Sequence, residues 1–416
     1  MVRHERTLLG AWQAIEANAW TSQQAKSREQ AKKFGADLHR NLRKMKRRLR
    51  KGYTFSPVYG ATPPKGHGKE GKRPIAIATL EDRVVQRAIL DVLQQATGLP
   101  KICAVLSTPT SVGGLPKRGV DNALKIFQHC VEGGYTHVAG SDIKDFFNRI
   151  PKRQVVDFVA SEVNDPKFVS LLEGALQVEL SNAANLGPED YKLFPTGDDG
   201  VAQGCPLSAL AGNIVLHEFD NEMNDPDRGL VCIRYIDDFI LVGRSHRSVR
   251  KGMEAATRIL RDLGMDAYDA VASPKKAFLG TIGQPFNFLG HELRPGRYPP
   301  SSAAIEKFKQ NIDALIRGGQ RTIRKAADGR PLKPWDRGFA ATITSLDNAI
   351  CGWRGTYRSS HCPDVFAELD EWVRRRVQDF ERYLRSQPST ITAEQRLLAL
   401  GISPMEGTTS VAAASP

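Results

Sequence analysis

The chain has 416 residues, of which 41% are hydrophobic and 25% charged, a composition typical of globular proteins that excludes a fibrous or low-complexity chain. Its 59 Lys and Arg residues outnumber 46 Asp and Glu residues, which gives a net charge of +13 and a pI of about 9.5. This basic excess favours a polyanionic partner, first of all nucleic acid, although a basic enzyme without such a partner stays open.

The cysteines and the apolar runs indicate the compartment. Six cysteines are spread along the chain without a Cys-x-x-Cys pair, so we expect reduced thiols and neither a zinc site nor a disulfide framework. The N-terminal segment lacks the apolar core of a signal peptide, and no uninterrupted apolar run approaches membrane-spanning length. These features predict a cytoplasmic protein with no membrane partner.

Residues 1–52 are predicted to form a basic helical extension. Four apolar residues recur at helical spacing in its last third: Leu38, Leu42, Met45 and Leu49. Cations surround this apolar face, among them Arg40, Arg43, Lys44, Arg47, Arg48, Arg50 and Lys51. They form either a solvated helix face or a surface that binds phosphate groups.

Residues 53–295 mix helical and strand-like patterns, which predicts an α+β fold. Helical patterns cover residues 81–98, 120–132, 207–223 and 253–265, and strand-like runs cover residues 138–140, 231–245 and 286–293. From about residue 300 the patterns are helical, and Gly318-Gly319 is expected to end the first helix there. Residues 391–416 are expected to form a C-terminal tail that is partly disordered.

Three aspartates carry the clearest chemical signal. Asp142 ends one strand-like run, and Asp237 and Asp238 interrupt the apolar run RYIDDFILVG. Carboxylates gathered at one edge of a sheet repel each other unless cations neutralise them. Magnesium prefers oxygen ligands, and two such ions can activate a 3′-hydroxyl and stabilise a leaving pyrophosphate. At this point Asp-rich surface turns are an equally good interpretation.

An ordered series of motifs resembles the reverse transcriptases of bacteria, in the lineage of group II intron and retron enzymes. The matching segments are KRPIAIATLEDRVVQRAI, SVGGLPKRGVDNAL, DIKDFFNRI, AQGCPLSALAGNIVLHEFD, RYIDDFILVG, SPKKAFLG and FNFLGHEL. YIDD corresponds to the family's YxDD box. The resemblance implies an RNA-directed DNA polymerase with a right-hand polymerase fold: fingers and palm, with an antiparallel sheet plus helices, over residues 53–295 and an all-helical thumb over residues 296–390.

The resemblance also implies the catalytic residues. Asp142, Asp237 and Asp238 correspond to the family's catalytic acids, with Asp142 and Asp237 as the main ligands of two Mg²⁺ ions, which Mn²⁺ would be able to replace. The main-chain carbonyl of Ile143 would help to hold the ion on the nucleotide side.

Further residues are implied to contact the substrates. Those assigned to the incoming dNTP are Arg73, Lys72, Phe147, Gln203 and Lys276, with Lys69 as a further helper. Phe147 would exclude a ribose 2′-hydroxyl, with core packing beside Phe146 as its alternative. Lys276 would protonate the pyrophosphate, although Lys275 fits as well by spacing. Those assigned to primer and template are Tyr235, Ile236, Gly290, Arg374 and Arg375, with solvated arginines as the alternative for the last two.

Two departures from the intron form narrow the resemblance. Ala209 follows QGCPLS where intron proteins usually have proline, and SVGGLPKRG differs from the intron segment, so the chain is most similar to freestanding reverse transcriptases linked to antiviral defence. We therefore expect copying of a structured, locus-encoded RNA into cDNA from a DNA or RNA primer, in antiphage defence. The alternatives are an intron maturase or RNA-binding protein, and a template-independent or protein-primed DNA polymerase. The oligomeric state stays undetermined.

Overall fold

The structure is a computed structural model that describes residues 1–21, 25–65, 71–333, 335–388 and 391–402. The chain divides into two compact units, Met1–Gln284 and Pro285–Pro416, which we describe separately. The predicted α+β class is confirmed, since helices and an antiparallel sheet make up the chain. The division after Gln284 comes earlier than the expected start of a helical region at residue 296, because the hairpin formed by residues 286–293 belongs to the second unit.

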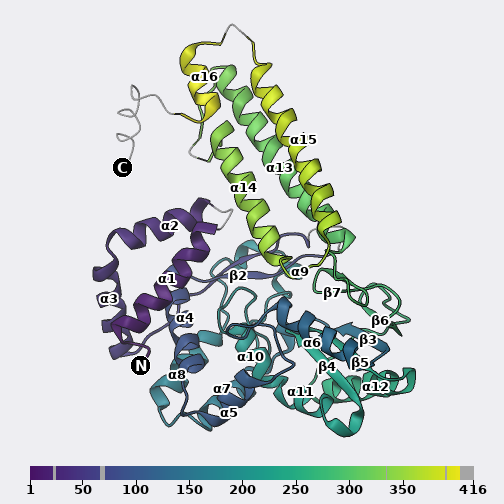
Figure 1. Cartoon of the computed structure of the whole chain (residues 1–416). Helices are drawn as coiled ribbons and strands as arrows, with labels where there is room; N and C mark the ends of the chain where they lie inside the picture. The colour runs from purple at the N-terminus through teal and green to yellow at the C-terminus, as the bar shows by residue number, and fades with distance from the viewer. Residues whose placement is uncertain (22–24, 66–70, 334, 389–390, 403–416) are drawn as a thin grey trace. The chain divides into compact units, whose positions relative to one another are not determined.

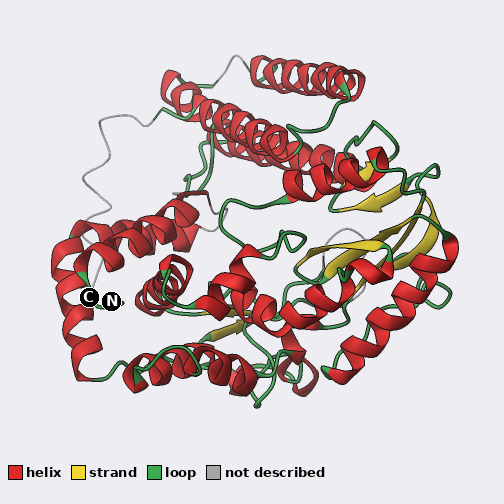
Figure 2. Cartoon of the chain, turned by 60° about the horizontal axis from the view of Figure 1, so that its bottom comes forward, coloured by secondary structure: helices red, strands yellow, loops and turns green. Residues whose placement is uncertain are grey.

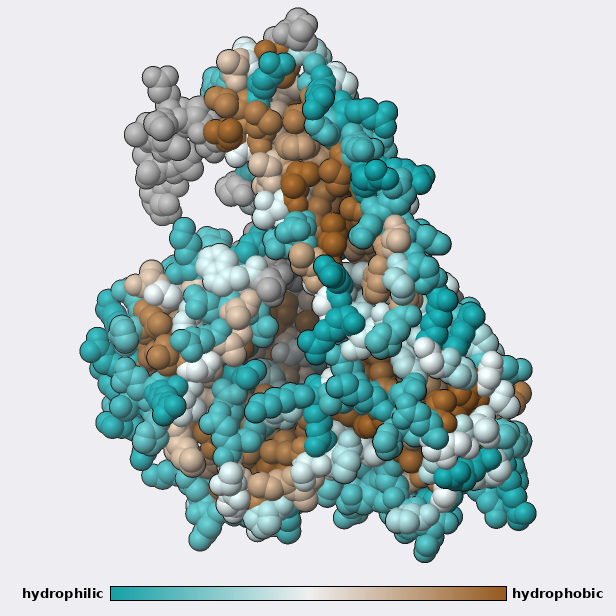
Figure 3. Space-filling model, in the orientation of Figure 1, coloured by the Kyte–Doolittle hydropathy of each residue, from teal (hydrophilic) through white to brown (hydrophobic). Residues whose placement is uncertain are grey.

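The first unit begins with three helices, drawn in purple in Figure 1: α1 (Glu5–Thr21), α2 (Ala25–Ala36) and α3 (Leu38–Lys51). Leu42 and Met45 of α3 are buried, as the helical spacing predicts. The cations Arg43, Arg47 and Arg50 are exposed on its other side. Figure 3 shows mostly hydrophilic side chains along the left edge, where Figure 1 places α3.

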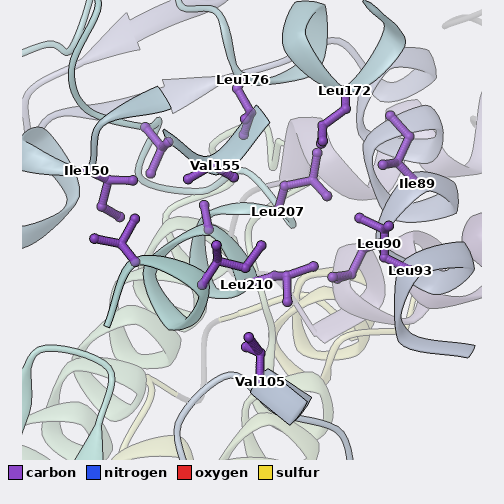
Figure 4. Close-up of a cluster of buried hydrophobic side chains, with 14 of the residues drawn as sticks. Ile89, Leu90, Leu93, Val105, Ile150, Val155, Leu172, Leu176, Leu207 and Leu210 are labelled. Atoms are coloured by element: carbon purple, nitrogen blue, oxygen red, sulfur yellow. The ribbon is translucent and has the colours of Figure 1, made fainter. Parts of the chain in front are cut away.

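A helical core follows in the same unit. Its helices are α4 (Leu80–Gln95), α5 (Pro100–Ser107), α7 (Lys152–Ala160), α8 (Pro166–Leu176) and α10 (Ser208–Val215). Their apolar faces converge, and Figure 4 shows Leu93 of α4, Val155 of α7, Leu172 of α8 and Leu210 of α10 pointing into one cluster. This close-packed cluster supports the segments that carry the site residues.

A four-stranded antiparallel sheet stands beside this core. Its strands are β3 (His137–Asp142), β4 (Leu230–Tyr235), β5 (Asp238–Gly243) and β6 (Ala277–Thr281), in the order β4-β5-β3-β6. The helix α12 (His246–Asp262) contacts all four strands, and α6 (Val120–Glu132) and α11 (His217–Met223) contact β4. Figure 2 shows the yellow strands with helices packed against them. Phe239, Ile240 and Leu241 of β5 are buried. The apolar residues that frame the aspartates are therefore packed between the sheet and its helices.

Smaller elements complete the first unit. A two-stranded sheet consists of β1 (Tyr59–Ala61) and β2 (Ile75–Ile77), and the short helices are η1 (Phe146–Arg149), η2 (Ala183–Asn185), α9 (Pro188–Tyr191) and η3 (Pro226–Arg228). Gly60 of β1 lies against Leu180 and Phe194, so the segment after α8 covers one face of this sheet. Among the described residues no single helix is long and apolar enough to cross a membrane. The helices α4 and α5, taken together as a bent pair, do reach that length and apolar composition.

The described residues of the second unit form a hairpin followed by four helices. Its elements are β7 (Phe286–Phe288), β8 (His291–Leu293), α13 (Ser302–Ala327), α14 (Phe339–Thr356), α15 (Pro363–Arg385) and α16 (Ala393–Leu400). Its core includes Phe308, Ile312, Leu346 and Phe380. The helix α16 occupies part of the expected C-terminal tail, where a capping box at Thr392 begins it and Ala399 is buried in the core.

The glycine pair in α13 does not end that helix, contrary to the expectation from the sequence. A Cβ at Gly319 would lie 2.6 Å from Oγ1 of Thr342 and 2.7 Å from Cζ of Phe380. The helix therefore continues through the pair to Ala327, and the absence of a side chain lets α14 and α15 approach closely.

Candidate active site

The YIDD segment forms a β-hairpin with a two-residue turn. Tyr235 of β4 pairs with Asp238 of β5, so Ile236 and Asp237 are the central residues of the turn. Ile236 has a φ of +60°. A positive φ at the first central residue alone is the pattern of a type II′ turn, in which glycine is the usual residue. A β-branched residue there is strained and stays only because its surroundings hold it.

The adjacent strand brings the third aspartate to this turn. Asp142, the last residue of β3, is directly paired with Asp238 of β5. The main-chain nitrogen of Ile143 then donates to the main-chain carbonyl of Asp237 over 2.8 Å. Antiparallel partners point to the same face of a sheet, so the carboxyl groups of Asp142 and Asp238 lie on one face. The structure thus brings together the three aspartates that the sequence places in two distant segments.

Lys276 adds a positive charge to this cluster. Its ammonium group forms an ion pair with Oδ2 of Asp142, and its carbonyl accepts a hydrogen bond from the Asp142 nitrogen at 3.3 Å. Burial lowers the pKa of the Lys276 ammonium, but the hydrogen bond and charge of Asp142 outweigh burial and leave that pKa above its ordinary value. Lys276, rather than Lys275, is therefore the lysine placed against the three aspartates.

Asp237 is held in an environment that disfavours its charge. Burial raises the pKa of the Asp237 carboxyl above its ordinary value, and the charge of Asp142 raises it further, while Lys276 and Arg234 oppose the rise. A divalent cation between Asp142 and Asp237 would relieve this penalty, and carboxylate and carbonyl oxygens are the ligands that Mg²⁺ prefers. The donor set therefore fits magnesium, although no group of three or more His, Cys, Asp or Glu side chains in the described residues has metal-binding spacing.

The two phenylalanines after Asp142 have different surroundings. Phe146 is 2% exposed, and its ring lies where a Cβ on Gly212 would be 2.7 Å away, so it is a core residue. Phe147 is only partly buried, with its ring centroid 5.4 Å from that of Phe146. The carbonyl of Phe147 accepts a hydrogen bond from the nitrogen of Val201 at 2.7 Å. Of these two rings, that of Phe147 therefore has the exposed surface that a ligand could contact.

Three of the residues assigned to the nucleotide lie beside β2: Lys72, Arg73 and Gln203. Arg73 and Lys72 are exposed on the segment that leads into β2, and the carbonyl of Gln203 accepts a hydrogen bond from the nitrogen of Ala76 at 3.2 Å. The ammonium of Lys72 lies 2.7 Å from Oδ1 of Asp190 on α9. Asp190 is a partner that the motifs did not predict, because α9 lies outside every matched segment. Lys69 lies outside the described residues.

The remaining assigned residues fall in both units. Tyr235 and Ile236 are partly buried beside the aspartates in the first unit. In the second unit, Gly290 has a φ of +81° in the turn between β7 and β8. Arg374 and Arg375 of α15 are exposed, and both pair with Glu371.

Arg376 of α15 differs from these neighbours, since it pairs with Asp313 of α13 at 2.6 Å. It connects two helices of the second unit, whereas the side chains of Arg374 and Arg375 stay on the surface of α15. Only the latter two arginines are therefore exposed enough to meet a polyanion without breaking a contact between helices.

Comparison with known proteins identifies the family to which this geometry belongs. Residues 63–293 match the family described as "Reverse transcriptase (RNA-dependent DNA polymerase)". The chain belongs to the reverse transcriptase family. The match covers all three aspartates, and it confirms the resemblance seen in the sequence motifs.

Three curated relatives match parts of this reverse transcriptase. It is 26% identical over 265 residues to "Protein YkfC" of Escherichia coli (strain K12), which covers 55% of this chain and 65% of that protein. It is 29% identical over 180 residues to "Group II intron-encoded protein LtrA" of Lactococcus lactis subsp. cremoris. This match covers 43% of this chain and 27% of that protein. It is 30% identical over 168 residues to "Uncharacterized 91 kDa protein in cob intron" of Schizosaccharomyces pombe. This match covers 40% of this chain and 19% of that protein.

Among solved structures, one similar chain comes from the "Partial Cas6-RT-Cas1--Cas2 complex". Its identity is 20%, its TM-score is 0.32, and the match covers 62% of this chain and 42% of that one. The chain thus spans less than two thirds of the length of the curated relatives and of this structure, so their whole-protein activities do not transfer to it directly.

Proposed function

We propose that the protein is an RNA-directed DNA polymerase that extends a primer by two-metal-ion nucleotidyl transfer. The observation that carries this proposal is the meeting of Asp142, Asp237 and Asp238 at one end of the four-stranded sheet, with Lys276 against Asp142. Family membership supports the same chemistry. Asp142 at the end of β3 and Asp237 in the turn, linked by the hydrogen bond from Ile143 to Asp237, would form an oxygen site for magnesium.

Each residue of the site has a part in this chemistry. Asp142 and Asp237 would hold the two Mg²⁺ ions, with Asp238 nearby and the Ile143 carbonyl on the nucleotide side. When bound, the ions would lower the pKa of the primer 3′-hydroxyl and stabilise the leaving pyrophosphate. Lys276 would give a proton to the departing pyrophosphate, a role that the contact of its ammonium with Asp142 supports.

The substrate side of the site is formed by residues on the neighbouring elements. Arg73 and Lys72 would neutralise the triphosphate, and Gln203 would lie beside the nucleotide. Phe147 would exclude the ribose 2′-hydroxyl, since its ring is partly exposed beside the buried Phe146. Tyr235 and Ile236 would contact the primer end.

The nucleic acid partners follow from the distribution of charge. The exposed cations of α3 and the net charge of +13 support binding of a structured RNA template and its cDNA, with Gly290, Arg374 and Arg375 as primer and template contacts from the second unit. A role in antiphage defence is supported by SVGGLPKRG and QGCPLSA, which differ from the intron form. A cytoplasmic location is supported by the cysteine spacing, which favours reduced thiols. The match to an intron-encoded protein favours intron maturation as the second candidate.

Incorporation of dNTPs on a primed RNA template tests the chemistry. The variants Asp142→Ala, Asp237→Ala and Asp238→Ala should each abolish synthesis while the protein stays folded, because these acids serve the metal site. Asp262→Ala is the matched control, since Asp262 is exposed at the end of α12. Wild-type synthesis in a folded Asp237→Ala protein would contradict the mechanism.

Sequencing the RNA and DNA that copurify with the protein tests the template. A DNA complementary to a bound RNA supports reverse transcription. A DNA without such a match supports template-independent or protein-primed synthesis. Splicing of a bound intron without incorporation of dNTPs supports the maturase alternative.

A further inference from the structure

Arg234, the residue before the YIDD turn, is a fully buried cation. It is 0% exposed, and its ion-pair partner Asp220 of α11 is 2% exposed. The guanidinium has five N–H donors, and each has an acceptor in the structure. Nε and Nη2 donate to the two carboxylate oxygens of Asp220 at 2.7 and 2.5 Å. Nη2 also donates to Oγ of Ser111 at 2.8 Å, and Nη1 donates to Oδ1 of Asn213 at 3.1 Å.

The fifth bond leaves this network and reaches the catalytic turn. Nη1 of Arg234 donates to the main-chain carbonyl of Ile236 at 2.9 Å. Ile236 is the residue with the positive φ, and Asp237 is bonded to it directly. This bond therefore connects the strained Ile236 to the guanidinium of Arg234. The side chains of Asp220, Asn213 and Ser111 fix the position of that guanidinium.

Two glycines also lie against the turn. A Cβ at Gly113 would lie 2.5 Å from the nitrogen of Ile236, and one at Gly114 would lie 2.9 Å from Cδ1 of Ile236. Asn213 holds this segment in place, because its amide donates to the carbonyl of Gly113 at 2.9 Å. The backbone of SVGG therefore lies directly on the turn, and only residues without a side chain fit there.

Stability alone is a poor explanation for the ion pair. A buried ion pair loses so much hydration that well-packed apolar residues of similar volume are often equally stable. A strained turn residue, in contrast, persists only where the surrounding structure determines its conformation. The bidentate geometry of the Arg234–Asp220 pair fixes the plane of the guanidinium, and with it the direction of the bond to Ile236.

We propose that Arg234 is a positioning residue for nucleotidyl transfer, which holds Ile236 in its left-handed conformation and so fixes the Asp237 carboxylate near Asp142. Asp220, Asn213 and Ser111 orient the guanidinium. Asp237 is then held from two sides, by the nitrogen of Ile143 and by the braced carbonyl of Ile236. The inference rests on the proposed role of Asp237 as a metal ligand.

The first test is Arg234→Lys, which keeps a charge for Asp220 but lacks the planar fork. We expect kcat for dNTP incorporation to fall on the order of 100-fold, the size of effect that a displacement of about 1 Å produces, with the KM for primed template nearly unchanged. Mn²⁺ binding, followed by electron paramagnetic resonance, should weaken in parallel. Arg244→Lys is the matched control, because Arg244 is an exposed arginine at the other end of β5.

The decisive test is rescue by Ile236→Gly. Glycine adopts a positive φ without strain, so it should need the Arg234 bond less. We expect Arg234→Lys to lower kcat about tenfold less in the Ile236→Gly background than in the wild-type background, a difference of about 1.4 kcal/mol. Ile236→Gly should also restore Mn²⁺ binding. Simple multiplication of the two losses would overturn the proposal, since it would mean that Arg234 does not act through the turn.

A second variant covers the case in which Arg234→Lys does not fold. The double variant Arg234→Met, Asp220→Leu replaces the ion pair by apolar groups, which such buried sites tolerate. It should fold but show the same loss of kcat and of Mn²⁺ binding. Wild-type kcat in a folded Arg234 variant would overturn the positioning role alone, whereas a wild-type protein that neither binds Mn²⁺ nor incorporates dNTPs would overturn the proposed function as well.

Discussion

The main-chain nitrogen of Ile143 donates to the main-chain carbonyl of Asp237 over 2.8 Å, and this bond joins the end of β3 to the turn between β4 and β5. Almost a hundred residues separate the two in sequence. The bond sets the spacing of Asp142 and Asp237 through the backbone rather than through flexible side chains. The position of the two carboxylates therefore depends little on whether they carry charge, and variants of either acid should keep the fold.

Asp237→Asn should stabilise the metal-free protein near neutral pH. The folded-state pKa of Asp237 is raised by burial and by Asp142, so the folded protein favours the protonated acid. That preference stabilises the fold below the unfolded-state pKa and is lost as the pH rises through the folded-state pKa. The wild type is thus penalised at pH 7 and the amide is not.

Thermal unfolding in EDTA measures this difference. The melting temperature of Asp237→Asn should exceed that of the wild type at pH 7, and the gap should close as the pH falls below about 4, near the ordinary pKa of aspartate. A gap that widens toward low pH would contradict the assignment.

Phe146 and Phe147 should respond differently to truncation. Phe146→Ala should lower the free energy of unfolding by about 3–5 kcal/mol, because it leaves a cavity beside Gly212. Phe147→Ala should cost less stability but should lower the discrimination between dNTPs and rNTPs by about tenfold or more. Denaturant unfolding and single-nucleotide incorporation measure the two effects. Unchanged sugar selectivity in Phe147→Ala would reassign that ring to packing.

The exposed cations of α3 should contribute to RNA affinity through counterion release. Changing Arg43, Arg47 and Arg50 to Gln should weaken RNA binding and reduce the slope of log K against log salt by up to about 2, if all three contact phosphates of a single strand. The matched control changes three exposed cations of α12 to Gln: Arg247, Lys251 and Arg258. Equal losses in both triple variants would mean that only net charge matters.

The ion pair between Lys72 and Asp190 should compete with substrate binding. The side chain of Lys72 is half exposed, so breaking the pair should change stability by at most about 1 kcal/mol. If Lys72 binds the triphosphate, Asp190→Asn should lower the KM for dNTPs and Lys72→Ala should raise it, each by roughly tenfold or about 1.4 kcal/mol. Steady-state kinetics with varied dNTP measures this, and shifts of the same sign in both variants would exclude competition.

Several parts of the fold follow from local sequence. The apolar spacing of Leu42 and Met45 predicts the buried face of α3, and the run around Asp237 predicts two strands and a tight turn. Wherever a residue's environment depends on a distant segment, the sequence left alternatives open. Phe146 and Phe147 look alike until Gly212 packs against one of them, and Lys275 and Lys276 look alike until one meets Asp142.

Sequence alone determined the family and the proposed catalytic acids, because the order and composition of the motifs carry both. Tertiary structure alone decided how those acids are held. The bonds from Arg234 to Asp220, Asn213, Ser111 and Ile236 join three separate motifs, and no single motif contains more than part of that network. The physical reason is that a buried charge and a strained turn are stable only when their partners arrive from elsewhere in the chain, and only folding brings those partners together.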